Sequence, residues 1–236
     1  MLQKVDEEEN RLACLQSIVH RLLCIAILLL TVAVAAPADT IYQTNAQGKR
    51  VVIQRDAILV KQDSSFLIYK HFDLQQRRVA KVTLNQGSLP YSIETESASR
   101  RQQIVSVWKR FGYTVTVSGA DGKTTRVFDA YLDFYPPEGR GSLLESLPAT
   151  TSLPLQLSSG GVDVIEFLKI SRIELSGDQF KVTLQNGQVE TGKFLMPTTQ
   201  PAEARFLGLT DHYDPASPDV FDFSLALAKI KQIEFE

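Results

Sequence analysis

The sequence predicts an all-β protein built from tandem small curled sheets, and three observations support this prediction. Apolar and polar residues alternate with a period of two from Arg50 onward, which is typical of half-buried strands. Strand-like runs end in tight polar turns that contain glycine, as in "KVTLNQG" and "FKVTLQNG". Related stretches also recur along the chain. A lone hairpin cannot bury its own apolar face, so recurring hairpins are expected to stack or to close on each other.

The first forty residues differ from the rest of the chain. Leu22–Ala36 is a continuous apolar run that follows His20 and Arg21, and Ala33–Ala35 supplies the small residues that a signal peptidase recognises. At about 15 residues the run is short for a membrane span, which needs about 20. We therefore expect residues 1–35 to form a signal helix that is removed on export. An uncleaved N-terminal membrane anchor is the alternative.

Two features of this leader bear on its start and on redox chemistry. Its acidic segment, Glu7–Glu9, is unusual because a signal peptide begins with positive charge, so one hypothesis places the true start near Val19. Both cysteines of the chain, Cys14 and Cys24, lie in the leader. A processed chain would therefore have neither disulfides nor thiol chemistry.

The strands of the remaining chain are expected in the order of its alternating runs. Val115 and Val117 alternate with threonines, Asp121-Gly122 makes a turn, and an apolar strand returns through Val127. "VDVIEF" and "VFDFSLAL" read as further strands, and no long amphipathic helix is expected after the leader.

The expected organisation is three β modules with two long loops. The module boundaries are placed at residues 40–112, 113–175 and 176–236, the first being the least regular. Tyr135–Pro154 and Met196–Asp219 are rich in proline and small polar residues, so both are expected to be loops. Long loops at comparable places in a module can form a binding face or simply be solvated.

The recurring unit can be aligned residue by residue. Phe167–Gly187 aligns with Phe66–Gly87, and Ala228–Glu236 gives a third copy of its first half. A strand ends in a short turn with one apolar residue, a second strand follows, and a tight turn leads into a K-V-T-L strand. The apolar positions of this unit are predicted to be core, namely Phe72, Val82, Leu84, Ile170, Ile173, Leu175, Val182, Leu184, Ile230, Ile233 and Phe235.

This pattern resembles a module of uncharacterised exported bacterial proteins whose repeats are small barrels of the SH3-like or Sm-like type. The resemblance implies SH3-like barrels and an exported compartment, and it implies no activity and no catalytic residues. It covers the last third of the chain well, the middle third fairly and the first third partly. The matching residues are Ile170, Ile173, Glu174, Leu175, Val182, Leu184, Gly187, Gly192, Phe223, Ile230, Ile233 and Phe235.

The most basic stretch offers a candidate binding surface. The only tryptophan, Trp108, is flanked by Arg100, Arg101, Lys109 and Arg110. Interleaved cations and aromatic rings can hold an anionic polymer or stack on a sugar. The alternative is an ordinary strand with Trp108 inward and its cations in water.

The acidic residues offer a weaker candidate for metal binding or hydrolysis. Asp211, His212 and Asp214 supply oxygen and nitrogen ligands for a divalent cation, although the proline-rich run around them also reads as a simple loop. A hydrolase built on the two long loops would bring Asp133 and Glu138 to Asp211 and Asp214. His71 and His212 are the histidines outside the leader, and no nucleophile motif accompanies them.

Taken together, these features favour a non-catalytic exported protein that binds or scaffolds something in the bacterial cell envelope, in the periplasm or outside the cell. We expect no cofactor and no enzymatic activity. A net charge of −2 gives no field that would attract nucleic acid, so no nucleic-acid partner is expected. The expected partner is an envelope protein or polysaccharide, with membrane attachment only if the leader is retained.

Overall fold

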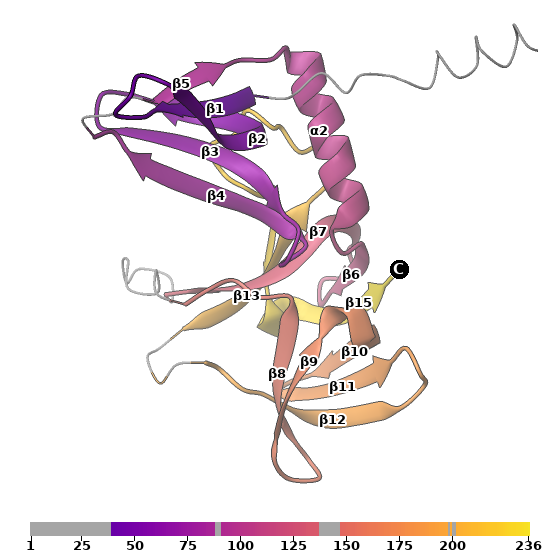
Figure 1. The fold of residues 1–236 in the computed structure, drawn as a ribbon. Helices are drawn as coiled ribbons and strands as arrows, with labels where there is room; N and C mark the ends of the chain where they lie inside the picture. The colour runs from indigo at the N-terminus through magenta and orange to yellow at the C-terminus, as the bar shows by residue number, and fades with distance from the viewer. Residues whose placement is uncertain (1–38, 88–90, 137–146, 198, 200–201) are drawn as a thin grey trace, which may run out of the picture. The chain divides into compact units, whose positions relative to one another are not determined.

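The computed structural model describes residues 39–87, 91–136, 147–197, 199 and 202–236. The predicted signal segment lies outside these residues, as does Glu138. Residues from Pro37 to Glu236 form one compact unit. This unit consists of two antiparallel sheets and the single α-helix of its described part, so the all-β prediction is confirmed (Figure 1).

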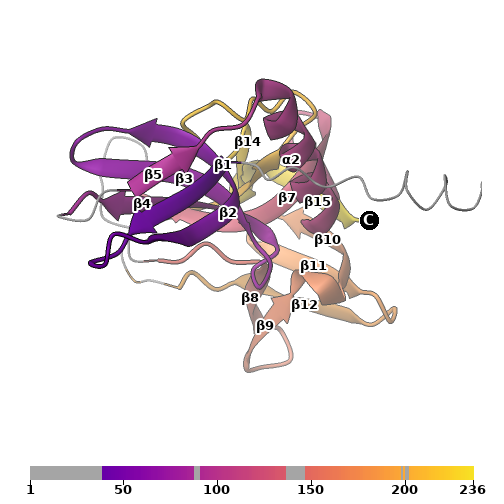
Figure 2. The ribbon, with the colours of Figure 1, turned by 45° about the horizontal axis from the view of Figure 1, so that its top comes forward.

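The first sheet has the strand order β4-β3-β2-β1-β5. Its first strand pairs with both the second and the fifth strand, which is how a five-stranded meander curls back on itself (Figure 2). Its small core contains Ile41, Ala57, Leu67 and Tyr69. The strand bounds are β1 (Asp39–Thr44), β2 (Arg50–Gln62), β3 (Phe66–Asp73), β4 (Arg78–Asn85) and β5 (Tyr91–Glu94).

The helix α2 (Ala98–Phe111) lies in a stretch where we expected no long helix and where an ordinary strand with Trp108 inward was one alternative. The strand is wrong, whereas Trp108 does lie inward. The Ser97 side chain caps the helix by accepting a hydrogen bond from the Arg100 N–H, and Gly112 ends it. Ile104, Val105 and Trp108 lie on one face of the helix and are buried. In Figure 1, α2 runs from the first sheet to β7, and it contacts both β4 and β7.

The second sheet has ten strands and divides into two halves of five. We call β10-β11-β12-β8-β9 the continuous half, because its strands lie in one stretch of the chain. We call β14-β13-β7-β6-β15 the split half, because its strands come from before and after that stretch. The strands are β6 (Val115–Gly119), β7 (Thr124–Tyr135), β8 (Ser152–Leu157), β9 (Val162–Glu166), β10 (Ile170–Ser176), β11 (Gln179–Leu184), β12 (Val189–Phe194), β13 (Glu203–Leu209), β14 (Phe223–Ala226) and β15 (Ile230–Phe235).

Each half contains the same short turn before the strand that pairs with the other half, so these two strands lie at the centre of the ten-stranded sheet. The 3₁₀ turn η1 (Phe167–Lys169) precedes β10, and η2 (Leu227–Lys229) precedes β15. The residues that end the two turns, Ile170 and Ile230, have φ/ψ values of −96°/135° and −95°/138°. Both are buried. The sequence alignment of these two segments therefore corresponds to one local backbone.

The strand pairing around the two central strands also matches. In the continuous half Ile173 pairs with Val182, and in the split half Ile233 pairs with Val117. Both ladders have a register shift at the first step after the turn. Ile173 and Ile233 face each other where β10 meets β15, and both are 1% exposed. The two halves thus join through an approximate two-fold relation centred on this pair.

The outer strands continue the same correspondence. β11–β12 has the register of β6–β7, with Val182 opposite Glu190 in one half and Val117 opposite Thr125 in the other. β8–β9 likewise has the register of β13–β14. The structure therefore interleaves the expected modules 113–175 and 176–236, since each half of the sheet takes strands from both.

The earlier hairpin, β3–β4, has a different geometry. Phe66 lies within a strand, whereas its aligned partner Phe167 lies in the 3₁₀ turn. Tyr69 pairs directly with Val82, and the connecting turn holds Arg77 at a positive φ of 51°. Phe72 is half-buried and packs beside Trp108 rather than in the core of the ten-stranded sheet. The residues of the first module that align with the later units in sequence therefore do not share their local backbone structure.

The predicted core residues lie inward to different degrees. Ile170, Ile173, Val182, Ile230 and Ile233 are buried in the core of the ten-stranded sheet. The others are half-buried and pack against a core, namely Phe72, Val82, Leu84, Leu175, Leu184 and Phe235.

One strand falls inside a stretch predicted to be a loop. β13 crosses Met196–Asp219, and its residues Phe206, Leu207 and Leu209 are fully buried. The prolines on both sides suggested a loop, but the apolar run between them is long enough for a strand covered on both faces.

Two buried charged residues hold the split half to the first sheet. The Lys70 ammonium of β3 donates to the Tyr213 hydroxyl at 2.5 Å and to the carbonyls of Ser217 and Asp219 at 2.7 and 2.5 Å. Burial lowers the Lys70 pKa to about 8, although nearby carboxylates partly oppose this. Asp129 of β7 accepts the Val79 N–H at 2.7 Å, and burial raises the pKa of Asp129 well above its ordinary value.

Candidate binding pocket

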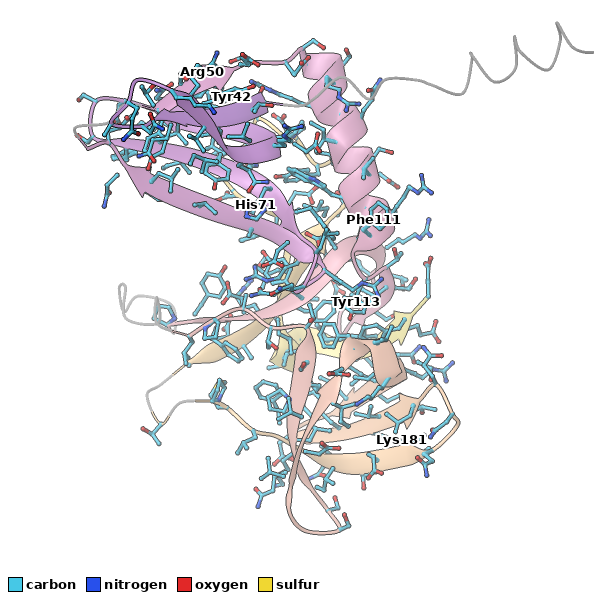
Figure 3. All side chains as sticks on the ribbon, viewed as in Figure 1. Tyr42, Arg50, His71, Phe111, Tyr113 and Lys181 are labelled. Carbon is cyan, nitrogen blue, oxygen red and sulfur yellow. The ribbon has the colours of Figure 1, made fainter. Side chains whose placement is uncertain are left out.

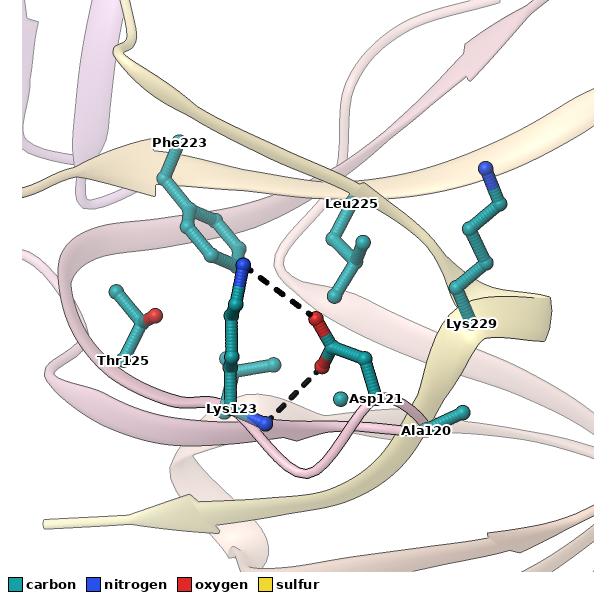
Figure 4. A pocket seen from close by; sticks show the side chains of 9 residues that line it. Ala120, Asp121, Lys123, Thr125, Phe223, Leu225 and Lys229 are labelled. Carbon is teal, nitrogen blue, oxygen red and sulfur yellow. Dashed lines mark hydrogen bonds and ion pairs between the residues drawn. The ribbon is translucent and has the colours of Figure 1, made fainter.

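An open pocket of about 380 Å³ lies in the split half, between the β6–β7 hairpin and β14 (Figure 4). Its volume is within the range of sites for small organic groups. Val117, Phe223 and Leu225 form its apolar surface. In Figure 4 the Phe223 and Leu225 side chains project toward the Lys123–Asp121 pair.

The pocket is open where the matching place in the continuous half carries a leucine. Gly119 ends β6, and its counterpart Leu184 ends β11. The two turns are alike: the Gly119 N–H donates to Lys123 O and the Leu184 N–H to Gln188 O, both at 2.8 Å. Leu184 packs against the core, whereas Gly119 has no side chain. A Cβ at Gly119 would lie 2.6 Å from Asp121 Oδ1, so the place that a leucine fills in the other half is bounded here by this exposed carboxylate.

Two residues that line the pocket are uncharged, whereas the corresponding residues of the continuous half carry carboxylates. Phe223 of β14 corresponds to Asp163 of β9. Each lies three residues before the end of its strand, and the two strands pair with β13 and β8 in the same register. Thr125 similarly corresponds to Glu190. Two carboxylates of the continuous half are thus replaced by an aromatic ring and a hydroxyl.

Cations stand at the rim of the pocket. Lys123 lies 3.9 Å from Asp121, and both side chains are mostly exposed. Lys229 is exposed and has its backbone carbonyl bound by the Ala120 N–H at 2.8 Å. The pocket therefore combines an apolar floor with two ammonium groups and one carboxylate. Such a site suits an apolar group that carries a negative charge.

The five predicted basic-stretch residues are mostly engaged within the fold. Trp108 is 2% exposed, so its indole is not available to stack on a sugar. Arg101 pairs with the buried Asp39 at 3.3 Å, and Lys109 donates to Thr210 O at 2.5 Å. Arg110 is exposed and Arg100 is half-buried. The structure therefore does not present these five residues as one surface.

The acidic residues proposed as metal ligands or catalytic groups each make a different contact within the fold. Among the described residues, no group of three histidine, cysteine or acidic side chains is placed to hold a metal ion. Asp211 lies 3.6 Å from the Lys109 ammonium, and Asp214 accepts the Ala216 N–H in its own turn. Asp133 lies on β7, where burial raises its pKa, and it accepts the Phe134 N–H. These contacts stabilise loops and a strand rather than form a ligand set.

The sequence analysis missed the pocket, although one signal was present. Aligning "VSGADG", residues 117–122, with "VTLQNG", residues 182–187, shows a glycine, Gly119, where the other copy has Leu184. The register of that hairpin was ambiguous in the sequence, so the difference at this position was not visible before the strands were paired.

A scan against protein-family models found no match, and searches of curated proteins and of solved structures found no similar protein. In the described part of the chain, no helix has both the length and the apolar character needed to cross a bilayer.

Proposed function

We propose that this chain is a non-catalytic binding protein whose split half receives an apolar, negatively charged segment of a partner protein. The observation that carries the proposal is Gly119, which opens a pocket at the position where the matched half has Leu184. The residues around it contribute an apolar floor and a cationic rim. The apolar floor favours a protein side chain over a polysaccharide, because sugars need polar partners and a flat exposed aromatic surface.

The similarity of the two halves suggests that the ten-stranded sheet arose by duplication of one module. Residues 113–175 and 176–236 can be tandem copies whose first hairpins, β6–β7 and β11–β12, have exchanged places. The equal registers and the two equivalent 3₁₀ turns support this interpretation. After duplication one copy of a site can stay closed and keep the fold stable, while the other opens for binding.

The proposed place of action is the bacterial cell envelope, reached by export. The apolar run Leu22–Ala36 and the absence of cysteine after it support this part of the proposal. The partner would then be another envelope protein. The small SH3-like or Sm-like barrel remains our expectation for the type of repeated module.

The pocket is tested with N-acetylphenylalanine, which joins an aromatic ring to a carboxylate. A molecule of this size is expected to bind with a dissociation constant on the order of 1 mM. Gly119→Leu gives the split half the residue of the continuous half, and it should weaken binding at least tenfold. The double change Lys123→Gln and Lys229→Gln should weaken it about fivefold, since exposed charges contribute about 1 kcal/mol or less each.

Leu184→Ala is the matched control, because it alters the same position in the other half. Binding to this variant should equal binding to the parent chain, measured by calorimetry or by ligand-detected NMR. The proposal fails if Gly119→Leu binds as well as the parent, or if the parent shows no binding up to 20-fold above the expected constant, about 20 mM.

A further inference from the structure

A second pocket, of about 250 Å³, lies at the end of α2 and is distinct in its residues from the pocket at Gly119. Arg77 from the β3–β4 turn and Arg110 from the last turn of α2 both line it. Thr114 and Gln185 add polar groups, and Leu168 of η1 adds an exposed apolar side chain. Figure 3 shows Phe111 and Tyr113 at this end of the helix.

The two arginines are available for an external anion. Arg77 Nε donates to Phe111 O at 3.1 Å, and its guanidinium lies 4.6 Å from the centre of the Tyr113 ring. These contacts fix the position of the guanidinium without neutralising it. Arg110 is exposed, and among the described residues it has no carboxylate within ion-pair distance. An arginine pair of this kind can hold the oxygens of a phosphate group.

The carboxylates near this pocket are already bound. Glu236 lines the pocket, but both of its oxygens accept from Arg126, at 2.9 and 2.5 Å. This pairing lowers the pKa of Glu236 and leaves it charged but compensated. Asp73, which ends β3 before the turn of Arg77, accepts the backbone N–H groups of Gln75 and Gln76, and these neutral donors leave its charge in place. Two guanidinium groups therefore face one carboxylate that has no cationic partner, so the local balance stays positive in a chain whose net charge is −2.

Exposed apolar side chains lie in the pocket or within a few residues of the two arginines along the chain. Leu168 is 62% exposed, and Phe111, which follows Arg110, is 51% exposed. Leu74 begins the turn that carries Arg77 and is 75% exposed, and Val107 lies one helical turn before Phe111. Large exposed apolar side chains beside arginines are typical of proteins that dip into the interface of a membrane, where apolar groups enter the lipid and cations meet the phosphates.

We propose that this surface binds the membrane, with Arg77 and Arg110 holding an anionic lipid headgroup and with Phe111, Leu168 and Leu74 entering the acyl boundary. Charge complementarity selects the occupant: two uncompensated guanidinium groups require an anion, and the apolar rim requires that the anion be attached to hydrocarbon. The inference does not depend on the pocket at Gly119.

Co-sedimentation with vesicles tests the inference on the full chain, so that any contribution of residues 1–36 is common to all variants. Binding to vesicles containing phosphatidylglycerol should exceed binding to pure phosphatidylcholine vesicles. Arg110→Gln should lower the partition about fivefold, and the double change Arg77→Gln and Arg110→Gln should lower it about 25-fold, because each basic residue at an anionic surface contributes about 1 kcal/mol. Phe111→Ser should lower it on both vesicle types.

Arg55→Gln is the control, since Arg55 is an exposed arginine on β2 outside this surface. It should leave the partition unchanged. Arg110→Gln alone keeps the test valid if the double variant folds poorly. The inference is overturned if Arg110→Gln and Arg55→Gln partition alike, or if the parent does not distinguish the two vesicle types. It is also overturned if inorganic phosphate at 10 mM abolishes vesicle binding, because the ligand would then be free phosphate.

Discussion

In the continuous half Leu184 ends the hairpin strand, and in the split half Gly119 takes its place. In the continuous half residues 158–161 connect two strands by a short turn, and in the split half Thr210–Asp222 makes the same connection through a long loop held on Lys70. The registers of the two hairpins that contain Leu184 and Gly119, and their pairing with β10 and β15, are alike.

This comparison shows where a pocket can arise without a change of fold. The central strands and the 3₁₀ turns keep the same backbone in both halves, because they carry the shared core around Ile173 and Ile233. The differences lie at the strand end and in the loops. The split half is also the one that the buried groups Lys70 and Asp129 connect to the first sheet. The half that contains the Gly119 pocket is therefore also the half that is bonded to the first sheet.

The largest expected effect concerns the residues at the centre of the comparison. Ile173→Ala and Ile233→Ala should each lower the free energy of unfolding by about 3 to 4 kcal/mol, because both side chains are fully buried. Since the two positions are equivalent, their losses should agree within about 1 kcal/mol, as measured by urea unfolding. A loss at only one of them would contradict the equivalence of the halves.

The next effect concerns the loop that the continuous half lacks. In the folded chain Lys70 has a pKa of about 8, against an ordinary value of 10.5. Below pH 8 Lys70 is protonated in both the folded and the unfolded state, so folding bears the full cost of burying its charge. As the pH rises above 8, the folded state releases the proton while the unfolded state keeps it, so stability increases. The gain from pH 8 to pH 9.5 should lie between about 1 and 2 kcal/mol.

Lys70→Met removes the titrating group and should remove this gain. Tyrosine ionisation begins near pH 10, so unfolding of the parent and of Lys70→Met is compared only up to pH 9.5. If the two proteins have parallel stability profiles between pH 8 and pH 9.5, Lys70 does not titrate as described.

A moderate effect is expected from exchanging the residues that distinguish the pocket. Leu184→Ala should cost about 2 kcal/mol, since the leucine packs half-buried against the core. Gly119→Leu should cost about 1 kcal/mol. Its backbone is not in the left-handed region, but the new Cβ would lie 2.6 Å from Asp121 Oδ1 and must displace this oxygen from its hydrogen bond with the Lys123 N–H. A loss of several kcal/mol in Gly119→Leu, seen in thermal unfolding, would mean that the space is not free for a side chain.

The smallest effect is expected on the exposed face. Lys181 pairs with Glu174 at 2.8 Å, and the split half has Thr116 at the corresponding position. Both side chains of this pair are largely in water. Lys181→Thr, which copies the split half, should therefore change the free energy of unfolding by less than about 0.5 kcal/mol. A larger change would show that the halves differ on this face too.

The sequence predicted the strands better than their partners. The β6–β7 and β11–β12 hairpins could be read from alternation and from glycine turns, with φ of +82° at Gly122 and +84° at Gly187. The sequence did not show whether each hairpin pairs with β10 or with β15, because the local sequences of the two hairpins are similar enough to fit either strand. The pocket depends on that pairing, so it was hidden as well.

The helix was missed for a different reason. Ser97 and Gly112 are ordinary cap signals on either side of α2, but the short run around Trp108 also fits a strand by alternation. Contact with β4 and β7 resolves this ambiguity in favour of the helix, since Ile104, Val105 and Trp108 then share one buried face.

The most direct test of the account compares the two hairpins within one protein. Backbone amide shifts are followed by NMR while N-acetylphenylalanine is added to the parent chain. The account predicts shifts at Gly119–Thr125 and at Phe223 and Leu225, with none at the corresponding Leu184–Glu190 hairpin. Equal shifts at both hairpins, or none at Gly119–Thr125, would contradict the claim that the residue differences at Gly119, Thr125 and Phe223 make a binding site at this hairpin and not at its counterpart.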